Sequence, residues 1–367
     1  MKRIILICLT CTYLFNGCAT KNYHQFVDQV AVDLAKSFDL SNEKFDKFKV
    51  SQINDQISVD TNKKEAHSKN NIKKKIENKK NKRAIKIIAK KLEKKTTAAG
   101  AAILKSELPV DYPESYKKWN ESSANIWKKF KSNVYPGEEM IMEISFLGIT
   151  VGAVKLKTGD VVEMGDNKVF NFSATLKSAN YYSMIYKLND TLSTYVDTNS
   201  FLPMKYTLTQ RESGQSVDDL QLYDHEKLKT FFWYKRLKKG VETKQEKSGF
   251  IPKYMQNIFS SLYFVRGLPL TIGTTLVYPI VTRTKIWMMT MTVEKKEEIK
   301  LLGKWIKAIK INAFTIVPGE KKKNGTISFW YSDDSEKKLL KFKANVKIGH
   351  VEGTLIEYHA GRHYEDK

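Results

Sequence analysis

Cysteine and proline are both scarce in this sequence. Among 367 residues there are 3 cysteines and 8 prolines, and the cysteines all lie near the start, as Cys8, Cys11 and Cys18. No disulfide and no thiolate metal site can therefore form within the chain beyond residue 18. The fold must come from burial of apolar residues, which make up 41% of the chain, enough for one large domain or two ordinary ones.

The sequence also lacks the motifs of the common enzyme classes. It has no Gly-x-Ser-x-Gly, no phosphate-binding loop, no dinucleotide fingerprint and no Cys/His nucleophile pair. We therefore expect a protein without catalytic activity and without a cofactor. An enzyme that acts on cell wall or lipid ranks behind the two non-catalytic roles described below.

Long apolar runs are missing too, apart from a short one at the start. Ile4–Phe15 follows Lys2 and Arg3 and is too short for a settled transmembrane helix, which is typical of a secretory signal. Gly17 and Cys18 come next. Here the chain resembles bacterial lipoprotein signal peptides, although Phe replaces the usual Leu three residues before the cysteine. The alternatives are an ordinary cleaved signal and an uncleaved anchor.

That resemblance implies removal of residues 1–17, acylation of Cys18 and lasting attachment to a membrane. Cys8 and Cys11 leave with the signal. By resemblance to enterobacterial sorting, Ala19 favours the outer membrane. We therefore expect an exported lipoprotein of the cell envelope that is anchored in the outer membrane and faces the periplasm.

Acidic residues are few beside basic ones, and the imbalance is local. The formal net charge is +23, and Lys63–Lys95, with fifteen Lys or Arg and three Glu, contributes 12 of those charges. Such a run is typical of a solvated, self-repelling spacer. The alternative is an arm that binds anionic lipid or wall polymer. Nucleic acid is not expected as a partner, because an exported protein seldom meets it and no aromatic residues alternate with the lysines.

Helical periodicity flanks this basic run. Apolar spacing predicts short helices over Tyr23–Phe38 and Leu40–Val50, the second with Ser41 as its N-cap, and both are expected to pack on another part of the chain. A longer amphipathic helix that docks on the following sheet is predicted by Tyr116, Trp119, Ile126, Trp127 and Phe130.

From residue 137 onward the apolar period changes from 3.6 to 2, which is typical of strands with one buried face. Met184–Val196 is expected to be a strand, and Leu340–Ile348 alternates apolar residues with lysine or asparagine. We predict about eleven or twelve strands in one large, curved antiparallel sheet, either a half-barrel or an open sandwich. One buried helix of about three turns is expected to begin at Pro252 and to end before Gly267.

The expected fold is therefore mainly β, preceded by an α-helical, Lys-rich N-terminal region. Its parts are a signal peptide (1–17), short amphipathic helices (18–60), a basic linker or arm (61–97), a linker with the docking helix (98–135), the antiparallel β domain (136–360) and a tail (361–367).

Three parts of the β region resemble the bacterial domain-of-unknown-function 3108 family. They are Glu143–Gly152 with its Gly-x-x-x-Gly, Ser260–Gly273 with its Leu-Pro-Leu-x-x-Gly, and Phe329–Asp334 together with residues 341–355. The likeness covers about Tyr135–Tyr358. It departs where the family often has Asp early in the helix, because Asn257 or Ser260 stands there. The resemblance implies an exported envelope protein with a mostly antiparallel β fold and no catalytic residues.

A few residues are candidates for a site. Arg266 could cap the preceding helix, pair with an acidic side chain or bind a ligand. Trp287, Met289 and Met291 share one face of a strand and form either an adaptable apolar ligand surface or plain core.

Other polar clusters are interpreted as structural. His359 and His363 have the i, i+4 spacing of metal ligands, but Gly361 weakens a helix there, so no metal is expected. Asp218–Asp219 and Asp333–Asp334 with Glu336 are interpreted as polar turns.

Two function classes follow from these expectations. The first is an envelope lipoprotein that binds a lipid, another hydrophobic ligand or a partner protein on a concave apolar face. The second is a structural, wall-associated lipoprotein whose basic arm contacts anionic polymer.

Overall fold

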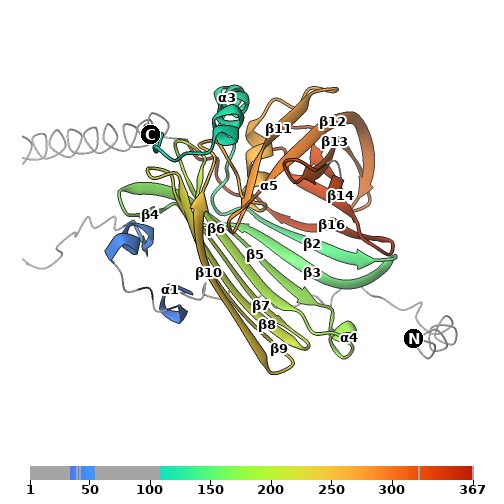
Figure 1. Ribbon diagram of the computed structural model, residues 1–367. Helices are drawn as coiled ribbons and strands as arrows, with labels where there is room; N and C mark the ends of the chain where they lie inside the picture. Colours follow the sequence, from blue (N-terminus) through green and yellow to red (C-terminus); the bar gives the residue numbers. More distant parts are fainter. Residues whose placement is uncertain (1–33, 39, 41–42, 54–107, 321–322, 366–367) are drawn as a thin grey trace, which may run out of the picture.

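The computed structural model describes residues 34–38, 40, 43–53, 108–320 and 323–365 (Figure 1). The predicted signal peptide, Cys18 and Lys63–Lys95 lie outside these residues. The described chain is mainly β, as predicted, and forms one sixteen-stranded antiparallel sheet. Its strands are β1 (Val50–Ser51), β2 (Glu139–Phe146), β3 (Ile149–Thr158), β4 (Val162–Met164), β5 (Asn167–Ser178), β6 (Asn189–Asp197), β7 (Pro203–Glu212), β8 (Gln215–Asp224), β9 (Lys229–Lys238), β10 (Val241–Phe250), β11 (Thr275–Thr282), β12 (Lys285–Leu301), β13 (Lys304–Ile316), β14 (Lys323–Ser332), β15 (Leu339–Asn345) and β16 (His350–His359).

The helices are short except for one. They are α1 (Leu34–Ser37), the 3₁₀ helix η1 (Glu43–Phe48), α3 (Glu114–Lys129), α4 (Asn180–Ser183), α5 (Ser260–Phe264) and the 3₁₀ helix η2 (Val265–Gly267). None of the helices in the described ranges is long and apolar enough to cross a membrane.

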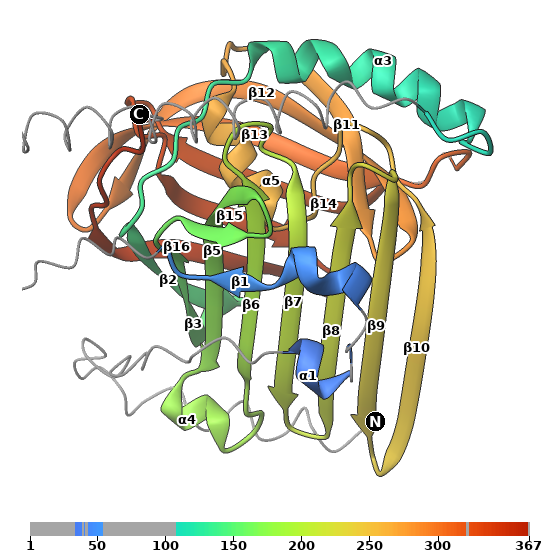
Figure 2. The ribbon, with the colours of Figure 1, turned by 90° about the vertical axis from the view of Figure 1, so that its left-hand side faces the viewer.

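The sheet consists of two meanders joined in its middle. Its order is β10-β9-β8-β7-β6-β5-β3-β2-β16-β15-β14-β13-β12-β11, and β4 pairs with β5 and β1 at the side. We call the meander from β2 to β10 the first wing and the meander from β11 to β16 the second wing. The two wings meet where β2 pairs with β16. Figures 1 and 2 show that the two wings curve around α5, which is the half-barrel arrangement predicted from the alternating pattern.

The inside of this curve is the main hydrophobic core. Both wings contribute to it, and so do α3 and the segment of residues 251–270 that includes α5. The ring of Tyr263 stacks on Phe172 of β5 with 3.8 Å between centroids, and Phe264 stacks on Phe130 at 4.8 Å. Aromatic packing of this kind holds α5 in the closed end of the half-barrel.

The core helix is much shorter than the three turns predicted from Pro252. Residues before it run beside β11 instead, where the N–H of Gln256 donates to Pro279 O at 3.0 Å and Val281 N–H donates to Gln256 O at 2.9 Å. The Asn257 side chain then accepts hydrogen bonds from the N–H groups of Phe259 and Ser260 and starts the helix there. Pairing with a strand and a late cap therefore override the apolar spacing that extends back to Met255.

The number of strands and two other boundaries also differ from the prediction. Four strands more than the largest predicted number are present in the described ranges. The predicted strand from Met184 begins only at Asn189, because α4 occupies residues 180–183. Val346 and Ile348 continue the alternation of β15, but the strand ends at Asn345 and both side chains are exposed in a turn.

Helix α3 confirms the predicted docking helix. Its Trp127 is buried, donates a hydrogen bond from Nε1 to Ser200 O at 3.1 Å, and packs against Phe264 and Tyr278. Just after the helix, Lys131 N–H donates to Gly267 O at 2.9 Å. Helix α3 therefore covers the end of the half-barrel that α5 fills, as Figure 2 shows along its upper edge.

Gly267 is the point of closest approach in this docking, and we expect Gly267→Ala to lower stability. A Cβ there would collide with the Phe130 ring and with Lys131 O, which is backbone and cannot swing away. Overpacking of this kind costs about 1–3 kcal/mol in the free energy of unfolding. Chemical denaturation measures it, with Gly249→Ala as the control, since that Cβ meets Thr284 Cγ2 at an ordinary 3.4 Å. Equal stability of the two variants would contradict the prediction.

The outer face of the first wing carries a second, smaller core. Leu34 and Phe48 from the N-terminal segments pack there with Trp233 and Leu220, and β1 pairs with β4. The predicted packing of these segments on another part of the chain is therefore confirmed. The predicted helix over Leu40–Val50 is instead the 3₁₀ turn η1 followed by β1, and of Tyr23–Phe38 the described residues include only the last turn, α1.

Candidate functional site

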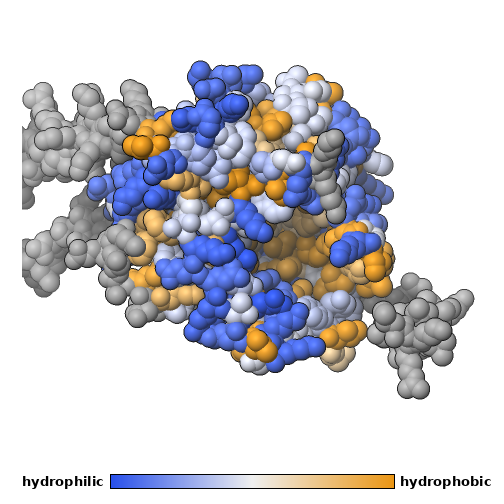
Figure 3. Space-filling view, in the orientation of Figure 1, coloured by the Kyte–Doolittle hydropathy of each residue, from blue (hydrophilic) through white to orange (hydrophobic). Residues whose placement is uncertain are grey.

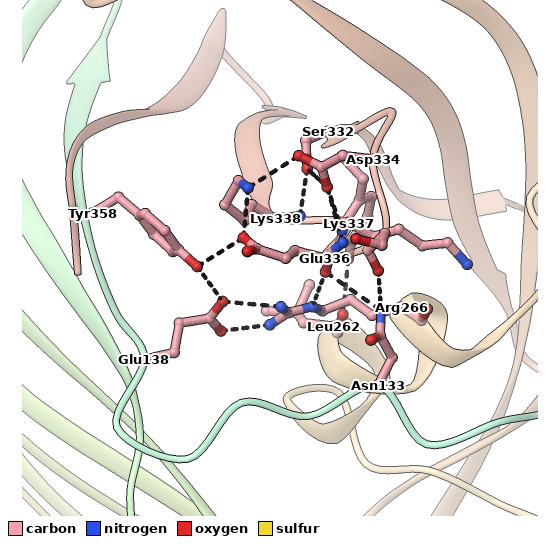
Figure 4. A network of polar contacts seen from close by, with 12 residues as sticks. Asn133, Glu138, Leu262, Arg266, Ser332, Asp334, Glu336, Lys337, Lys338 and Tyr358 are labelled. Carbon is pink, nitrogen blue, oxygen red and sulfur yellow. Dashed lines mark hydrogen bonds and ion pairs between the residues drawn. The ribbon is translucent and has the colours of Figure 1, made fainter. Parts of the chain in front are cut away.

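Arg266 lies in a buried polar network and not on an open surface (Figure 4). Its guanidinium makes two hydrogen bonds to the Glu138 carboxylate, at 2.5 and 2.9 Å, and both side chains are almost fully buried, with 2% and 0% exposure. Arg266 Nε also donates to Glu336 O at 3.0 Å. Burial works against its charge, but the paired carboxylate prevails and raises the pKa of Arg266. Pairing with an acidic side chain, one of the three roles considered for Arg266, is therefore what the structure shows.

The network ties three distant parts of the chain together. The Tyr358 hydroxyl of β16 donates to Glu336 at 3.0 Å and lies 3.3 Å from Glu138. Asp334 Oδ1 accepts hydrogen bonds from Ser332 Oγ and from two backbone N–H groups, so it closes the β14–β15 turn. The carboxylates of residues 334 and 336 therefore stabilise a turn, in agreement with the polar-turn interpretation.

The methionine strand packs inward. Met289 and Met291 of β12 are 5% and 3% exposed, and Met291 Sδ accepts a hydrogen bond from the Tyr278 hydroxyl at 3.1 Å. Trp287 is partly buried and packs against the same core. Their burial supports the core interpretation of these three residues, and the surface for a ligand must be sought elsewhere.

The remaining candidate residues are dispersed. His359 ends β16 and contacts Glu357, whereas the His363 ring lies on Tyr135, so no helix brings the two together. The polar-turn interpretation is wrong for Asp218 and Asp219, because both lie inside β8, where Asp218 pairs with Arg211 on the outer face of the first wing. Groups of three or more metal-ligating side chains are absent from the residues that the structure describes.

A hollow opens on the inner face of the first wing. Figure 3 shows it near the middle of the molecule, lined by hydrophobic residues coloured orange. The strand register identifies the lining, because side chains alternate between the two faces of a sheet. Phe172, Thr194 and Tyr206 point inward to the core, so every second residue along their strands shares that face. The partner of Leu176 across the ladder, Val154 of β3, shares it too. We call the apolar residues on this face beyond the core the inner row: Val154, Ala174, Leu176, Leu192 and Leu208.

The inner row begins where the filling of the half-barrel stops. Asn257 Nδ2 reaches Thr194 Oγ1 at 2.8 Å, and Tyr263 covers Phe172. One step further along the same strands, Leu192 and Ala174 stand opposite each other, and Leu208 stands opposite Leu192. All are only partly buried. The segment around α5 thus fills one end of the curve and leaves an apolar surface uncovered at the other.

Polar side chains border the inner row on β8 and β9. Arg283, in the β11–β12 turn, donates from Nε to Asp219 Oδ2 at 2.8 Å and lies over the Tyr234 ring at 4.0 Å. Its backbone N–H donates to Gln221 Oε1 at 2.6 Å. Burial raises the pKa of Asp219, and Arg283 opposes that shift. These contacts hold the tip of the second wing against the inner face of the first, although β10 and β11 do not pair.

A second polar group lies where the strands end. Asp190 accepts hydrogen bonds from Gln210 Nε2 at 3.2 Å and from Arg211 N–H at 3.0 Å. Burial raises the pKa of Asp190. The Tyr186 hydroxyl donates to Glu212 at 2.7 Å, and that hydrogen bond raises the pKa of Tyr186 to about 12. The hollow is therefore apolar along its floor and polar at its edge, an arrangement that suits an amphiphile.

Sequence reasoning found only part of this site. The alternation of Phe170, Phe172, Ala174 and Leu176 was readable as a strand with one apolar face, but nothing in it shows that α5 covers only its first half. Glu138, the partner of Arg266, carries no local signal, because it is a single acidic residue before a strand.

Comparisons with known proteins place the chain in a family. Among solved structures it is similar to a beta-barrel-like protein of the domain of unknown function DUF1849 from Brucella abortus, with TM-score 0.41, 9% identity, and coverage of 64% of this chain and 100% of that one. It is also similar to a protein assigned as a lipoprotein from Parabacteroides distasonis, with TM-score 0.27, 11% identity, and coverage of 63% of this chain and 99% of that one.

A third similar structure is that of a protein from Bacteroides fragilis, assigned as exported and with a YmcC-like fold. Its TM-score is 0.27 at 9% identity, and the match covers 63% of this chain and 98% of that one. No curated protein sequence matches the chain significantly. The model of the family described as "Protein of unknown function (DUF3108)" matches residues 142–356. This match spans more than half of the chain and confirms the resemblance found in the sequence: the chain belongs to the DUF3108 family.

Proposed function

We propose that the protein is an exported, lipid-anchored binding protein whose half-barrel holds a hydrophobic chain, such as the acyl chain of a lipid, against the inner row. The observation that carries the proposal is the uncovered apolar floor of the hollow in Figure 3, formed by Ala174, Leu192 and Leu208 beside the segment that fills the rest of the curve. Apolar surface of this kind, left half-buried in a concavity, is where a hydrophobic ligand gains most from leaving water.

The dimensions suit one extended chain. The inner row crosses four neighbouring strands, β3, β5, β6 and β7. With strands about 4.8 Å apart, it spans roughly 14 Å. The polar residues at its border would stay beside the hydrated end of the ligand, since a buried polar group without a partner is costly. We propose no chemical step at the row.

Export and anchoring are supported by the sequence pattern of residues 2–18. In this proposal Cys18 bears acyl chains, the outer membrane is the destination, and the half-barrel faces the periplasm. Labelling with a radioactive fatty acid tests the anchor, because the label should enter the chain and should be lost in Cys18→Ser. Equal labelling of the variant would contradict acylation at this residue.

The ligand is tested by native mass spectrometry on the full chain carrying Cys18→Ser, purified from the periplasm. We expect a stoichiometric adduct that solvent extraction identifies as an acyl species. Ala174→Phe fills the middle of the inner row without removing a contact, so it should abolish the adduct and weaken binding of a dansylated fatty acid at least about tenfold.

The control differs from this variant by one position. Thr175 precedes Leu176 on the same strand and faces the opposite side of the sheet, so Thr175→Phe should leave the adduct and the dansyl signal unchanged. A clean apo mass together with no fatty-acid binding by the parent chain would contradict the proposal.

A structural role at the cell wall is the second candidate. The net charge of Lys63–Lys95 favours it, because fifteen cations in one segment attract anionic polymer. Binding to purified wall polymer should then fall steeply with salt and should vanish when this segment is replaced by a Gly/Ser linker of equal length.

A further inference from the structure

Exposed apolar side chains gather at the open end of the half-barrel. They stand in three connections: the β2–β3 turn, the β5–β6 loop that contains α4, and the β15–β16 turn. We call them the apolar rim: Leu147, Ile149, Tyr181, Met184, Ile185 and Ile348, which are between 53% and 85% exposed. Most large apolar residues on this domain are buried, so a group of this size at one end needs a reason.

The three connections form one continuous surface. The Tyr181 hydroxyl of α4 donates to Thr150 O in β3. Leu147 N–H donates to His350 O, and the Leu147 side chain lies over Gly349, where any Cβ would collide with it. The β15–β16 turn, the β2–β3 turn and α4 are therefore neighbours, and they lie at the strand ends beside the hollow (Figures 1 and 3).

The turn segments that carry the rim contribute lysines and no carboxylates. Residues 145–150, 178–189 and 345–350 contain Lys187 and Lys347 but no Asp or Glu. Both lysines are exposed. The nearest carboxylates belong to the strands behind these turns: they are Glu143, Glu212 and Glu352, and Glu352 pairs there with Lys341 and Lys343. Apolar side chains at turn tips whose own charged residues are lysines match the physics of an interfacial contact with anionic lipid, in which apolar groups enter the acyl boundary and cations meet head groups.

We infer that the apolar rim is a docking surface for an anionic bilayer, and that it holds the open end of the half-barrel against the membrane. This contact is separate from the acyl anchor and from the basic run, and it does not depend on whether the hollow holds a ligand. Turn tips that project singly can enter a bilayer without forming the flat, closely packed face that a protein partner requires.

A local probe tests this on the full chain with Cys8→Ser, Cys11→Ser and Cys18→Ser. Met184→Cys, labelled with the environment-sensitive fluorophore NBD, is mixed with vesicles of phosphatidylcholine alone and of phosphatidylcholine with phosphatidylglycerol. We expect a blue shift and stronger emission with the anionic vesicles and much less change with the neutral ones. The matched control is Ile272→Cys in the loop between η2 and β11, which is 55% exposed and should show no shift, because residues 268–276 contain no charged residue.

Two serine variants then measure the affinity. The double variant Met184→Ser with Ile185→Ser should weaken binding to the anionic vesicles at least about tenfold, because burial of one such apolar side chain in the membrane already contributes about a factor of ten in affinity. Val110→Ser with Ile272→Ser removes exposed apolar area away from the rim and from any lysine-only turn, and should have no effect. Both pairs are exposed, so folding is preserved.

Two outcomes would overturn the inference. If the chain sediments with vesicles while the label at position 184 stays in water, the contact is made by the basic run alone. If the label shifts with protein concentration and without vesicles, the rim is an interface between copies of the chain. The outcome for Ala174→Phe is independent, since that variant should bind vesicles like its parent even though it loses the fatty acid.

Discussion

Arg266→Met should unfold the protein at a markedly lower temperature than the parent. The substitution leaves the Glu138 carboxylate buried at 0% exposure without its cation. Breaking one partner of a buried, bidentate ion pair costs about 3–5 kcal/mol in the free energy of unfolding. Thermal unfolding followed by circular dichroism measures this. Removal of the guanidinium also removes the hydrogen bond from Arg266 Nε to Glu336 O, which joins η2 to the β14–β15 turn.

Two further variants make the result specific. Arg211→Met removes an arginine that pairs with Asp218 and whose side chain is 45% exposed. The free energy of unfolding should therefore fall by less than about 1 kcal/mol. Glu138→Leu combined with Arg266→Met replaces the whole pair by apolar groups and should recover much of the lost stability. If Arg266→Met were no more harmful than Arg211→Met, the pair would not stabilise the fold.

The protein should lose stability on mild acidification because of His225. This ring is buried in the β8–β9 turn, and its Nε2 is hydrogen-bonded to Pro203 O at 2.7 Å. Burial lowers the pKa of His225 from 6.5 to about 4. Between those values the unfolded chain binds a proton that the folded chain refuses, so the free energy of unfolding rises with pH. It should therefore fall by about 3 kcal/mol as pH drops from 7 towards 4.

His225→Gln isolates this effect. A Gln side chain can still donate to Pro203 O but takes up no proton, so denaturant melts at pH 7 and pH 4.5 should differ less for this variant than for the parent. His359→Gln, at an exposed position, should keep the parent's pH dependence. The same pH dependence in His225→Gln as in the parent would show that other groups govern acid unfolding.

Periodicity was enough to predict the class of fold and the docking helix. Strands with one wet face reveal themselves by alternation, and Trp119 and Trp127 at helical spacing marked α3 correctly. The resemblance to the family rested on short motifs such as Gly148-x-x-x-Gly152. The structure explains the second of these glycines, because a Cβ at residue 152 would collide with Lys177 O on the neighbouring strand.

Tertiary contacts decided what periodicity could not. The stretch from Pro252 looked like a three-turn helix, but Gln256 bridges to β11 and the helix starts only after it, because this pairing and the Asn257 cap outweigh local spacing. The candidate site lay beyond prediction for a related reason. Half-buried and fully buried apolar positions, such as Leu192 and Val196 on one strand, have the same sequence pattern and differ only in what covers them.

The pairing of β2 with β16 has a consequence for how the chain becomes a sheet. Each meander pairs neighbours in sequence, so its contacts are local, whereas the β2–β16 seam joins residues some two hundred positions apart. Contacts of such high contact order form slowly. The backbone after β16 then returns beside its beginning, where Arg362 N–H donates to Pro136 O and Tyr364 N–H to Val134 O. A circular permutant that links residue 365 to residue 108 and opens the chain between α5 and β11 would join β16 to β2 through α3, which makes the seam a far more local contact, and should fold faster than the natural order.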